Sequence, residues 1–440
     1  MAAASIAEGM SPALLKVMER AKTDRTFRFS SVAHLINEAA LARAYQRLRK
    51  DAAVGVDGVT VEKYGEALEV NLRDLHRRMK AMQYRHQPIR RVHIPKEKGK
   101  TRPIGISAVE DKVVQGALRE VLEAIYEQDF LPCSYGFRPG RGAHDAIREL
   151  SLVVNRGEVN WVLEADIMSF FDSVDRNALK EMLQLRISDG SMMRLIGKCL
   201  HVGVLDGDEY AEPEVGTAQG SVLSPLLGNV YLHNVLDVWF EEEVKPRLRG
   251  KATLIRYADD FVIGFEREDD ARRVMAVIGQ RMTKYGLTLH PDKTRLLPFG
   301  RPSKTQLGGK GPATFDFLGF TQHWQRSRAG RWYMACKTRG ARLGRAIRAA
   351  YDWCRSHRHQ PLKDQHLALS RRLRGHFNYF GVNGNLRSLR ALGHAVTKAW
   401  YKWLRKRSQR RLNWKRFNAI LRRFPLPRPR IVVQIWARSS

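Results

Sequence analysis

The chain of 440 residues lacks the cysteine patterns of a zinc-binding or disulfide-bonded protein. It has four cysteines, and none of them forms a CxxC pair: Cys133, Cys199, Cys336 and Cys354. Zinc-ribbon and zinc-finger spacings are therefore absent, and the spacing also argues against a disulfide framework. We expect a protein of a reducing, intracellular compartment.

Long hydrophobic runs are also missing. The N-terminus, MAAASIAEGM, has no basic start followed by an apolar core, as a signal peptide would have. A long uncharged stretch at about 215–236 is broken by polar residues such as Gln219, Asn229 and Asn234, so it would be a poor membrane span. We expect a soluble protein of the cytoplasm, bacterial in setting, with no membrane partner. Its length predicts two or more domains.

Acidic residues are nearly absent from the C-terminal part. Residues 321–440 contain 30 Lys and Arg but only two acids, Asp352 and Asp364, whereas the first 320 residues contain 47 Lys and Arg and 43 acids. A positive surplus confined to one segment indicates a polyanionic partner. We expect nucleic acid, with an anionic membrane surface as the alternative.

The remaining pattern mixes helices and strands. Apolar residues at helical spacing predict helices within 1–80, at 113–126, at 178–183, at 268–285 and through most of the segment after residue 340. Short apolar runs predict strands at 88–106, 161–166 and 252–265, and a hairpin around the turn at 327–330. A segment rich in Gly, Pro and Lys, residues 298–312, predicts a loop. This order predicts an α+β fold, not a regular βαβ alternation.

Three aspartates stand where apolar strands are predicted to end. Asp259 and Asp260 interrupt LIRYADDFVIGF, and Asp166 ends WVLEAD. Clustered carboxylates repel one another unless a cation lies among them, and oxygen ligands select Mg²⁺ or Mn²⁺. Two such ions can activate a 3′-hydroxyl and stabilise a leaving pyrophosphate. Taken singly, the Asp pair is also typical of a tight hairpin turn, and Asp166 of a helix cap.

The order of the sequence blocks resembles the palm of reverse transcriptases. A strand ending in Asp166 is followed by GTAQGSVLSPLLGNVYLHNVLD, RYADDFVIGF, GLTLHPDKTRLLPF and FDFLGF, with YADD as the YxDD box. The upstream blocks HIPKEKGKTRPIGI, EDKVVQGAL and FLPCSYGFRPGRGAHDAI are similar to those of group II intron reverse transcriptases, or maturases. The resemblance runs from about residue 30 to about residue 430.

The resemblance implies a right-hand polymerase. Its fingers and palm, an antiparallel sheet plus helices, would be followed by an all-α thumb. Residues 1–80 would be an N-terminal helical extension of the fingers, 81–310 the fingers and palm, and 311–440 a basic helical thumb or maturase domain. The oligomeric state stays open.

The same resemblance implies roles for single residues. Asp166 and Asp259 would be the main catalytic metal ligands, with Asp260 a supporting ligand and the backbone carbonyl of Ile167 completing one metal site. Phe171 would be a gate that excludes a ribose 2′-OH, with core packing as the plainer interpretation. The other dNTP contacts would be Lys96, Arg102, Gln219, Gly220 and Lys293, although Ala218 stands where the family commonly has Pro.

Two further sets of residues would contact nucleic acid. Leu318 and Gly319 match the primer grip. The basic C-terminal helices carry tryptophans at helical spacing, which we expect in the core, and cations that we expect to face RNA: Arg405, Lys406, Arg407, Arg410, Arg411, Lys415 and Arg416.

The leading interpretation is a ribonucleoprotein component that binds its group II intron RNA and assists splicing. It would then copy that RNA into cDNA from a DNA primer and dNTPs after insertion into target DNA. The alternatives are a domesticated reverse transcriptase in phage defence or DNA repair, and a maturase whose polymerase has decayed. No Cys-rich HNH pattern is present, and His144, His357 and His359 form no metal-binding pattern, so we expect no second-strand cleavage.

Overall fold

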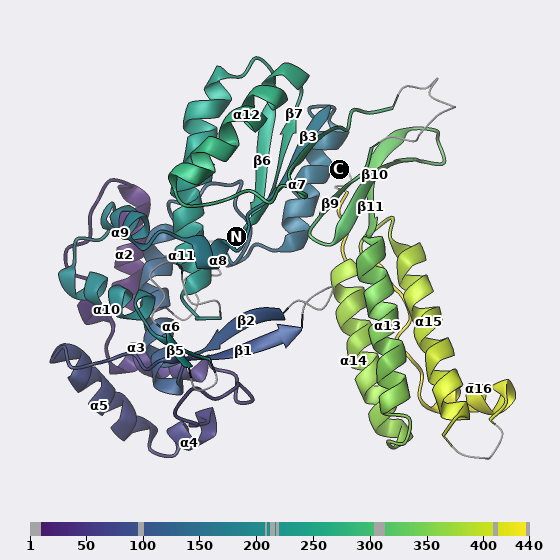
Figure 1. Ribbon diagram of the computed structural model, residues 1–440, viewed down its shortest axis with the longest axis horizontal. Coiled ribbons are helices and arrows are strands. Elements are labelled where there is room, and N and C mark those ends of the chain that lie inside the picture. The colour runs from purple at the N-terminus through teal and green to yellow at the C-terminus, as the bar shows by residue number, and fades with distance from the viewer. Residues whose placement is uncertain are drawn as a thin grey trace.

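The computed structural model describes residues 10–95, 101–206, 209–211, 216, 220–302, 313–407 and 412–436. Helices and mainly antiparallel strands alternate irregularly through these residues, which confirms the α+β class (Figure 1). None of the helices in this part of the chain has the length and apolar character that crossing a membrane requires.

A four-stranded antiparallel sheet, which we call the central sheet, carries Asp166 and Asp260 at its strand ends. Its strand order is β6-β7-β3-β8, so the hairpin of β6 and β7 lies beside the strand that ends in Asp166. The strands are β3 (Trp161–Asp166), β6 (Ala252–Tyr257), β7 (Asp260–Phe265) and β8 (Arg295–Pro298). The strands predicted at 161–166 and 252–265 are confirmed.

Both faces of this sheet are buried, which explains its continuous apolar runs. Leu163 and Ile263 point into the core that contains α12 (Glu268–Lys284), whereas Val162 and Val262 point into the core that contains α7 (Ala143–Asn155). Successive residues of a strand face opposite sides. The sheet is therefore sandwiched between α12 and α7 (Figure 1).

The N-terminal helices pack around a long buried helix, α6 (Val109–Tyr126), whose first turn carries Glu110 and Asp111 at the positive end of the helix dipole. Side chains of Ser11, Asn37 and Thr60 cap three of the surrounding helices. These surrounding elements are α2 (Pro12–Thr23), a 3-10 turn (Ala33–Leu35), α3 (Glu38–Gln46), α4 (Val61–Gly65) and α5 (Leu68–Lys80).

A second sheet, of order β2-β1-β4-β5, lies beside these helices. Its β1–β4 pair is parallel, and its other pairs are antiparallel. The strands are β1 (Ile89–Pro95), β2 (Thr101–Ile106), β4 (Val204–Asp206) and β5 (Glu209–Ala211).

Further helices connect this region to the central sheet. The helix α11 continues into π-helical turns, a local geometry that is often found at functional sites. The connecting elements are α8 (Phe170–Ser173), α9 (Arg176–Gln184), α10 (Gly190–Leu200), α11 (Ser224–Leu232), two π-helical segments (His233–Asp237 and Trp239–Val244) and a 3-10 turn (Lys245–Arg247).

The C-terminal part begins with a three-stranded sheet and continues as a helical bundle. The sheet has the order β11-β10-β9. The expected hairpin is confirmed as β10 and β11, and β9 pairs with β10 as a third strand. In Figure 1 the bundle lies to the right and the N-terminal helices lie to the left, and the β1–β2 hairpin appears between them in this view. The elements are β9 (Phe315–Phe317), β10 (Phe320–Arg326), β11 (Trp332–Thr338), α13 (Gly340–Ser356), α14 (Leu362–Phe380), α15 (Leu386–Arg405) and α16 (Trp414–Arg423).

The tryptophans of this bundle are not all in its core. Trp400 is fully buried, as expected, but Trp414 is 45% exposed and packs edge-on against Tyr401. The reason is that α16 is short and contributes only Phe417 to the core. The domain boundaries expected near residues 80 and 310 stay predictions.

Candidate functional site

The three aspartates converge at one end of the central sheet. Asp166 is the last residue of β3, Asp260 is the first residue of β7, and the two are direct cross-strand partners. Asp259 lies in the turn between β6 and β7, after Ala258, which has a φ of 57°. The antiparallel pairing of β3 with β7 therefore brings together carboxylates that are about 90 residues apart in sequence.

The clustering of like charges affects the pKa of Asp260. Removal from water, the negative charges of Asp259 and Asp166, and a hydrogen bond to Asp166 raise the pKa of Asp260 to about 7. Because Asp260 is an exposed residue, we attribute more of this rise to the two neighbouring carboxylates than to burial. A cation bound here would relieve the repulsion.

Lys293 supplies the positive charge that faces this cluster. Its ammonium group forms an ion pair with the carboxylate of Asp166. Backbone bonds hold the segment in place: His290 N donates to Asp166 O at 2.8 Å, and Met168 N donates to Thr288 O at 2.8 Å. These bonds flank Ile167 and leave its carbonyl out of the pairing. Both Ile167 and Lys293, chosen from the sequence, thus lie beside Asp166.

A buried arginine supports the turn from beneath. Arg256 of β6 is fully buried, and it forms a two-pronged ion pair with Asp237 of the π-helical segment, with N···O distances of 2.7 and 2.6 Å. Its guanidinium also donates to the carbonyl of Ala258 at 3.1 Å and to Asn229 Oδ1 at 3.0 Å. Sequence reasoning missed this pair, although an arginine inside an apolar strand was a visible signal.

Gly136 packs against the β6–β7 turn. Its backbone lies so near that an added Cβ would stand 2.9 Å from the carbonyl carbon of Tyr257 and would overlap the amide of Ala258. Asn229 donates to the Gly136 carbonyl at 2.7 Å. The block SYGFRPG therefore packs directly against YADD, and only glycine fits at this contact.

Phe171 and Phe170 occupy different environments. Phe170 is 4% exposed and belongs to the core, whereas Phe171 is half-buried, with its ring centroid 5.2 Å from that of Phe170. Both rings rest on Gly228 of α11, where a Cβ would meet them at 2.9 and 3.4 Å. This arrangement favours Phe171 over Phe170 as the ring that meets a ligand. The gate role itself stays a prediction.

The loop that carries Gly220 lies against β2. With a φ of 110°, Gly220 passes so close that a Cβ would stand 2.5 Å from the carbonyl oxygen of Gly105. The fully buried Gln115 of α6 accepts hydrogen bonds from Ser221 Oγ and Val222 N, both at 3.0 Å. Gln115 is a second residue whose part in the site the sequence did not reveal.

The turn Leu318–Gly319 joins β9 to β10 and faces helix α14. Tyr379 of α14 donates its hydroxyl to the Leu318 carbonyl at 2.9 Å. Burial raises the pKa of Tyr379 to about 12, with smaller effects from charged neighbours that include Asp260. The proposed primer grip and the aspartates therefore lie within electrostatic reach of one side chain.

The other sequence-derived residues divide into two groups. Lys96, Ala218, Gln219, Arg410 and Arg411 lie outside the described residues, and Arg102 belongs to β2 with only its backbone described. The remaining cations of the proposed RNA-binding set are all exposed at the end of α15 and the start of α16: Arg405, Lys406, Arg407, Lys415 and Arg416.

The donor set at the strand ends fits a hard divalent cation in its chemistry. It offers three carboxylates and the Ile167 carbonyl, which are the oxygen ligands that Mg²⁺ prefers. Among the described residues, however, no three His, Cys, Asp or Glu side chains are grouped tightly enough to enclose an ion. Asp166 is instead engaged by Lys293, so ion binding would require that side chain to move.

Comparison with known proteins agrees with this architecture. Residues 94–322 match the family model described as reverse transcriptase (RNA-dependent DNA polymerase). Protein YkfC of Escherichia coli (strain K12) is 36% identical over 281 residues, which cover 56% of this chain and 74% of that protein. The group II intron-encoded protein LtrA of Lactococcus lactis subsp. cremoris is 37% identical over 212 residues, 47% of this chain and 35% of LtrA.

A third relative extends the comparison. The uncharacterized 91 kDa protein in the cob intron of Schizosaccharomyces pombe is 35% identical over 223 residues, 50% of this chain and 27% of that protein. The aligned part thus spans about a third or less of both intron-encoded relatives. Residues 94–322, which match the family model, contain the central sheet and all three aspartates. The chain therefore belongs to the reverse transcriptase family, in the group that includes the group II intron-encoded proteins.

Proposed function

We propose that this enzyme copies RNA into DNA at the strand ends that carry Asp166, Asp259 and Asp260, and that its template in the cell is a group II intron RNA. The observation that supports the proposal most strongly is the meeting of the three carboxylates at the β6–β7 turn. The expected primer grip lies close by, across Tyr379. The cDNA would be primed by target DNA into which the intron has been inserted.

The residues of the chain would divide the work as follows. Asp166 and Asp259 would hold the catalytic ions, with Asp260 and the Ile167 carbonyl as supporting ligands. When bound, two Mg²⁺ ions, or Mn²⁺ ions, would activate the primer 3′-hydroxyl and stabilise the leaving pyrophosphate. Lys293 would leave Asp166 and turn towards the triphosphate, where a lysine acts as a point charge.

Other residues would position the substrates. The half-buried ring of Phe171 would collide with a ribose 2′-OH and so select dNTPs over NTPs. The loop at Gly220, held by Gln115, would lie beside the incoming nucleotide together with Gln219, Lys96 and Arg102. Leu318 and Gly319 would hold the primer end.

Primer extension tests the polymerase part of the proposal. We expect the purified chain to extend a DNA primer on an RNA template with Mg²⁺ and dNTPs, and Asp259→Ala to abolish extension. A chelator should stop the wild-type reaction, and renewed Mg²⁺ should restore it. Equal extension by wild type and Asp259→Ala would contradict the proposal.

Copurification tests the RNA partner. We propose that the exposed cations of α15 and α16 hold the intron RNA and stabilise its active fold, because structured RNA is bound mainly through phosphates and 2′-hydroxyls. RNA recovered with the tagged protein should be one structured RNA encoded around its gene. That RNA should splice faster with wild type than with Arg405→Ala/Lys415→Ala. Recovery of random RNA, or equal splicing with both proteins, would count against the maturase role.

A further inference from the structure

A basic groove crosses helix α10 at a distance from the aspartate cluster. It consists of two hollows that share Arg194 and Lys198. The larger, of about 790 Å³, lies between α9, α10 and the segment before β1. The smaller, of about 260 Å³, lies on the side of α10 that faces α5. We call the two hollows together the α10 groove.

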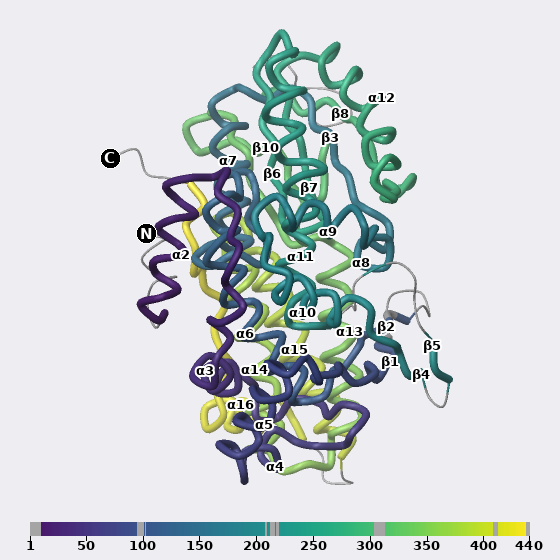
Figure 2. The backbone as a smooth tube through the Cα atoms, turned by 90° about the vertical axis from the view of Figure 1, so that its left-hand side faces the viewer, coloured from purple at the N-terminus to yellow at the C-terminus, as the bar shows by residue number. Residues whose placement is uncertain are grey.

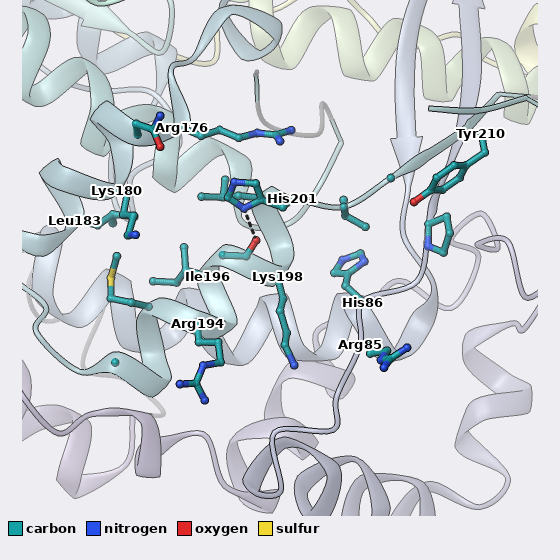
Figure 3. Close-up of a pocket in the computed structure, with 18 residues that line it drawn as sticks. Arg85, His86, Arg176, Lys180, Leu183, Arg194, Ile196, Lys198, His201 and Tyr210 are labelled. Atoms are coloured by element: carbon teal, nitrogen blue, oxygen red, sulfur yellow. Dashed lines mark hydrogen bonds between the residues drawn. The ribbon is translucent and has the colours of Figure 1, made fainter. Parts of the chain in front are cut away.

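The lining of the α10 groove carries charge of one sign. Its cations are Arg85, Arg176, Lys180, Arg194 and Lys198 in the larger hollow, and Lys80 in the smaller. Among the described residues that line either hollow there is no Asp or Glu. Figure 3 shows Arg194, Lys198 and Arg85 in a row along one edge. A concave surface of this kind concentrates polyanions.

Lys198 is fixed at the centre of this row. Its ammonium donates to the backbone carbonyls of Met82, at 3.2 Å, and of Tyr84. Removal from water and the positive charges of Arg194 and Arg85 lower the pKa of Lys198. The cations therefore repel one another, and an anion in the groove would be stabilising.

An aromatic ring stands at the edge of the larger hollow. Tyr210 of β5 is 56% exposed, and its ring lies so close to the backbone of Gly203 that a Cβ at that residue would overlap it. An exposed ring in a hollow that is also lined by cations is an arrangement suited to single-stranded nucleic acid, in which bases stack on aromatic faces and phosphates follow the charges.

The groove is separate from the proposed polymerase site. No residue assigned above to catalysis, dNTP binding or primer grip lines either hollow. In Figures 1 and 2, α9 and α10 lie on the side of the molecule away from the bundle of α13 to α16. A strand in this groove would thus be held outside the space between the central sheet and the bundle.

We propose that the α10 groove binds a single-stranded nucleic acid segment, with its phosphodiesters along Lys180, Arg194 and Lys198 and one base stacked on Tyr210. The bound strand is either RNA or DNA, since both carry the phosphates and bases that these residues recognise. The α10 groove would thus hold a segment of nucleic acid that lies outside the polymerase site.

Photocrosslinking of the full chain tests the proposal. Because the crosslinked peptide is identified, binding at the α10 groove is distinguished from binding at the basic C-terminal helices. The probes are a short oligouridine containing one 4-thiouridine and an oligodeoxythymidine containing one 4-thiothymidine, followed by mass spectrometry of the peptides. Crosslinks to the peptide that contains Tyr210 are expected. In 0.1 M salt, Lys180→Ala/Arg194→Ala should raise the half-saturating concentration for this crosslink roughly 25-fold, because each single-strand phosphate contact contributes a factor of about 5.

The matched control is Arg272→Ala/Lys284→Ala, which removes one exposed arginine and one exposed lysine from α12. This control should leave the crosslink unchanged, and both variants should unfold at the wild-type temperature, because all four side chains are exposed. Tighter binding of one probe identifies RNA or DNA as the partner. The proposal is overturned if Tyr210 is never crosslinked, if Lys180→Ala/Arg194→Ala binds like wild type, or if an oligoglutamate peptide displaces the probe more effectively than unlabelled oligouridine. The last result would assign the groove to an acidic protein.

Discussion

Arg256 and Asp237 form a fully buried ion pair directly beneath the turn that carries Asp259. Both side chains are 0% exposed, and the guanidinium also bonds to the Ala258 carbonyl within the turn. Desolvating two charges is costly, and in some proteins a buried pair fixes a geometry that apolar packing would not fix. We infer that the pair positions the YADD turn.

Replacing one partner of this ion pair should therefore lower the free energy of unfolding more than replacing both. Arg256→Leu leaves Asp237 buried without its counter-charge and should lower the free energy of unfolding by about 3–5 kcal/mol. Arg256→Leu/Asp237→Leu should recover most of that loss in urea denaturation, yet should remain impaired in primer extension because the turn is no longer held. Equal stability of the single and double variants would show that the pair is not coupled.

The raised pKa of Asp260 predicts a pH dependence of stability without metal. Between the ordinary carboxyl pKa of 3.8 and about 7, the folded protein binds more protons than the unfolded chain at this residue. The stability of chelator-treated wild type should therefore fall as pH rises through this window, and Asp260→Asn should weaken that dependence. Thermal unfolding across pH checks the result. A steeper fall for Asp260→Asn would contradict the raised pKa.

Gln115 should affect nucleotide binding although it lies inside α6. Gln115→Leu removes the acceptor of the buried Ser221 hydroxyl and of the half-buried Val222 N–H, which costs about 1–3 kcal/mol. If this loosens the loop at Gly220, the KM for dNTP should rise about tenfold with little change in primer–template affinity. Ser107→Ala, which removes one of the two partners of the Gln115 amide nitrogen, is the control and should have the smaller effect.

Tyr379 should affect primer retention. Tyr379→Phe removes the hydrogen bond to the Leu318 carbonyl, worth about 1 kcal/mol. Product length under single-encounter conditions should fall several-fold, with the rate of the first addition unchanged. Tyr401→Phe removes a similar hydroxyl-to-carbonyl bond, to Leu412 within the bundle, and should leave product length at the wild-type value. Equal effects of the two variants would argue against a primer grip at Leu318–Gly319.

Local patterns were sufficient to predict the strands around the aspartates. The apolar runs at 161–166 and 252–265 were recognisable because both faces of the sheet are buried, and antiparallel pairing then brings Asp166 to Asp260. The turn chemistry of Asp259 and Asp260 marked the hairpin correctly. The family resemblance, not the spacing, supplied the roles of these residues.

Long-range contacts could not be predicted in this way. Asp237, which meets Arg256, lies in the π-helical segment that follows α11, and no simple periodicity reveals such a segment. Gln115 looked like one polar position on an amphipathic helix, and its loop partners lie more than 100 residues away. Trp414 matched the spacing of core tryptophans, but its helix is too short to bury it.

Single-nucleotide addition is the most direct measurement of the central claim that these carboxylates carry the polymerase chemistry. The rate of adding one dNTP to a primer on an RNA template is compared for wild type, Asp259→Asn and Asp352→Asn, the last being an exposed aspartate of α13. We predict that Asp352→Asn matches wild type while Asp259→Asn loses at least about 10³-fold, close to the stabilisation attributed to a bound metal. A rate for Asp259→Asn within a few-fold of wild type would contradict the account.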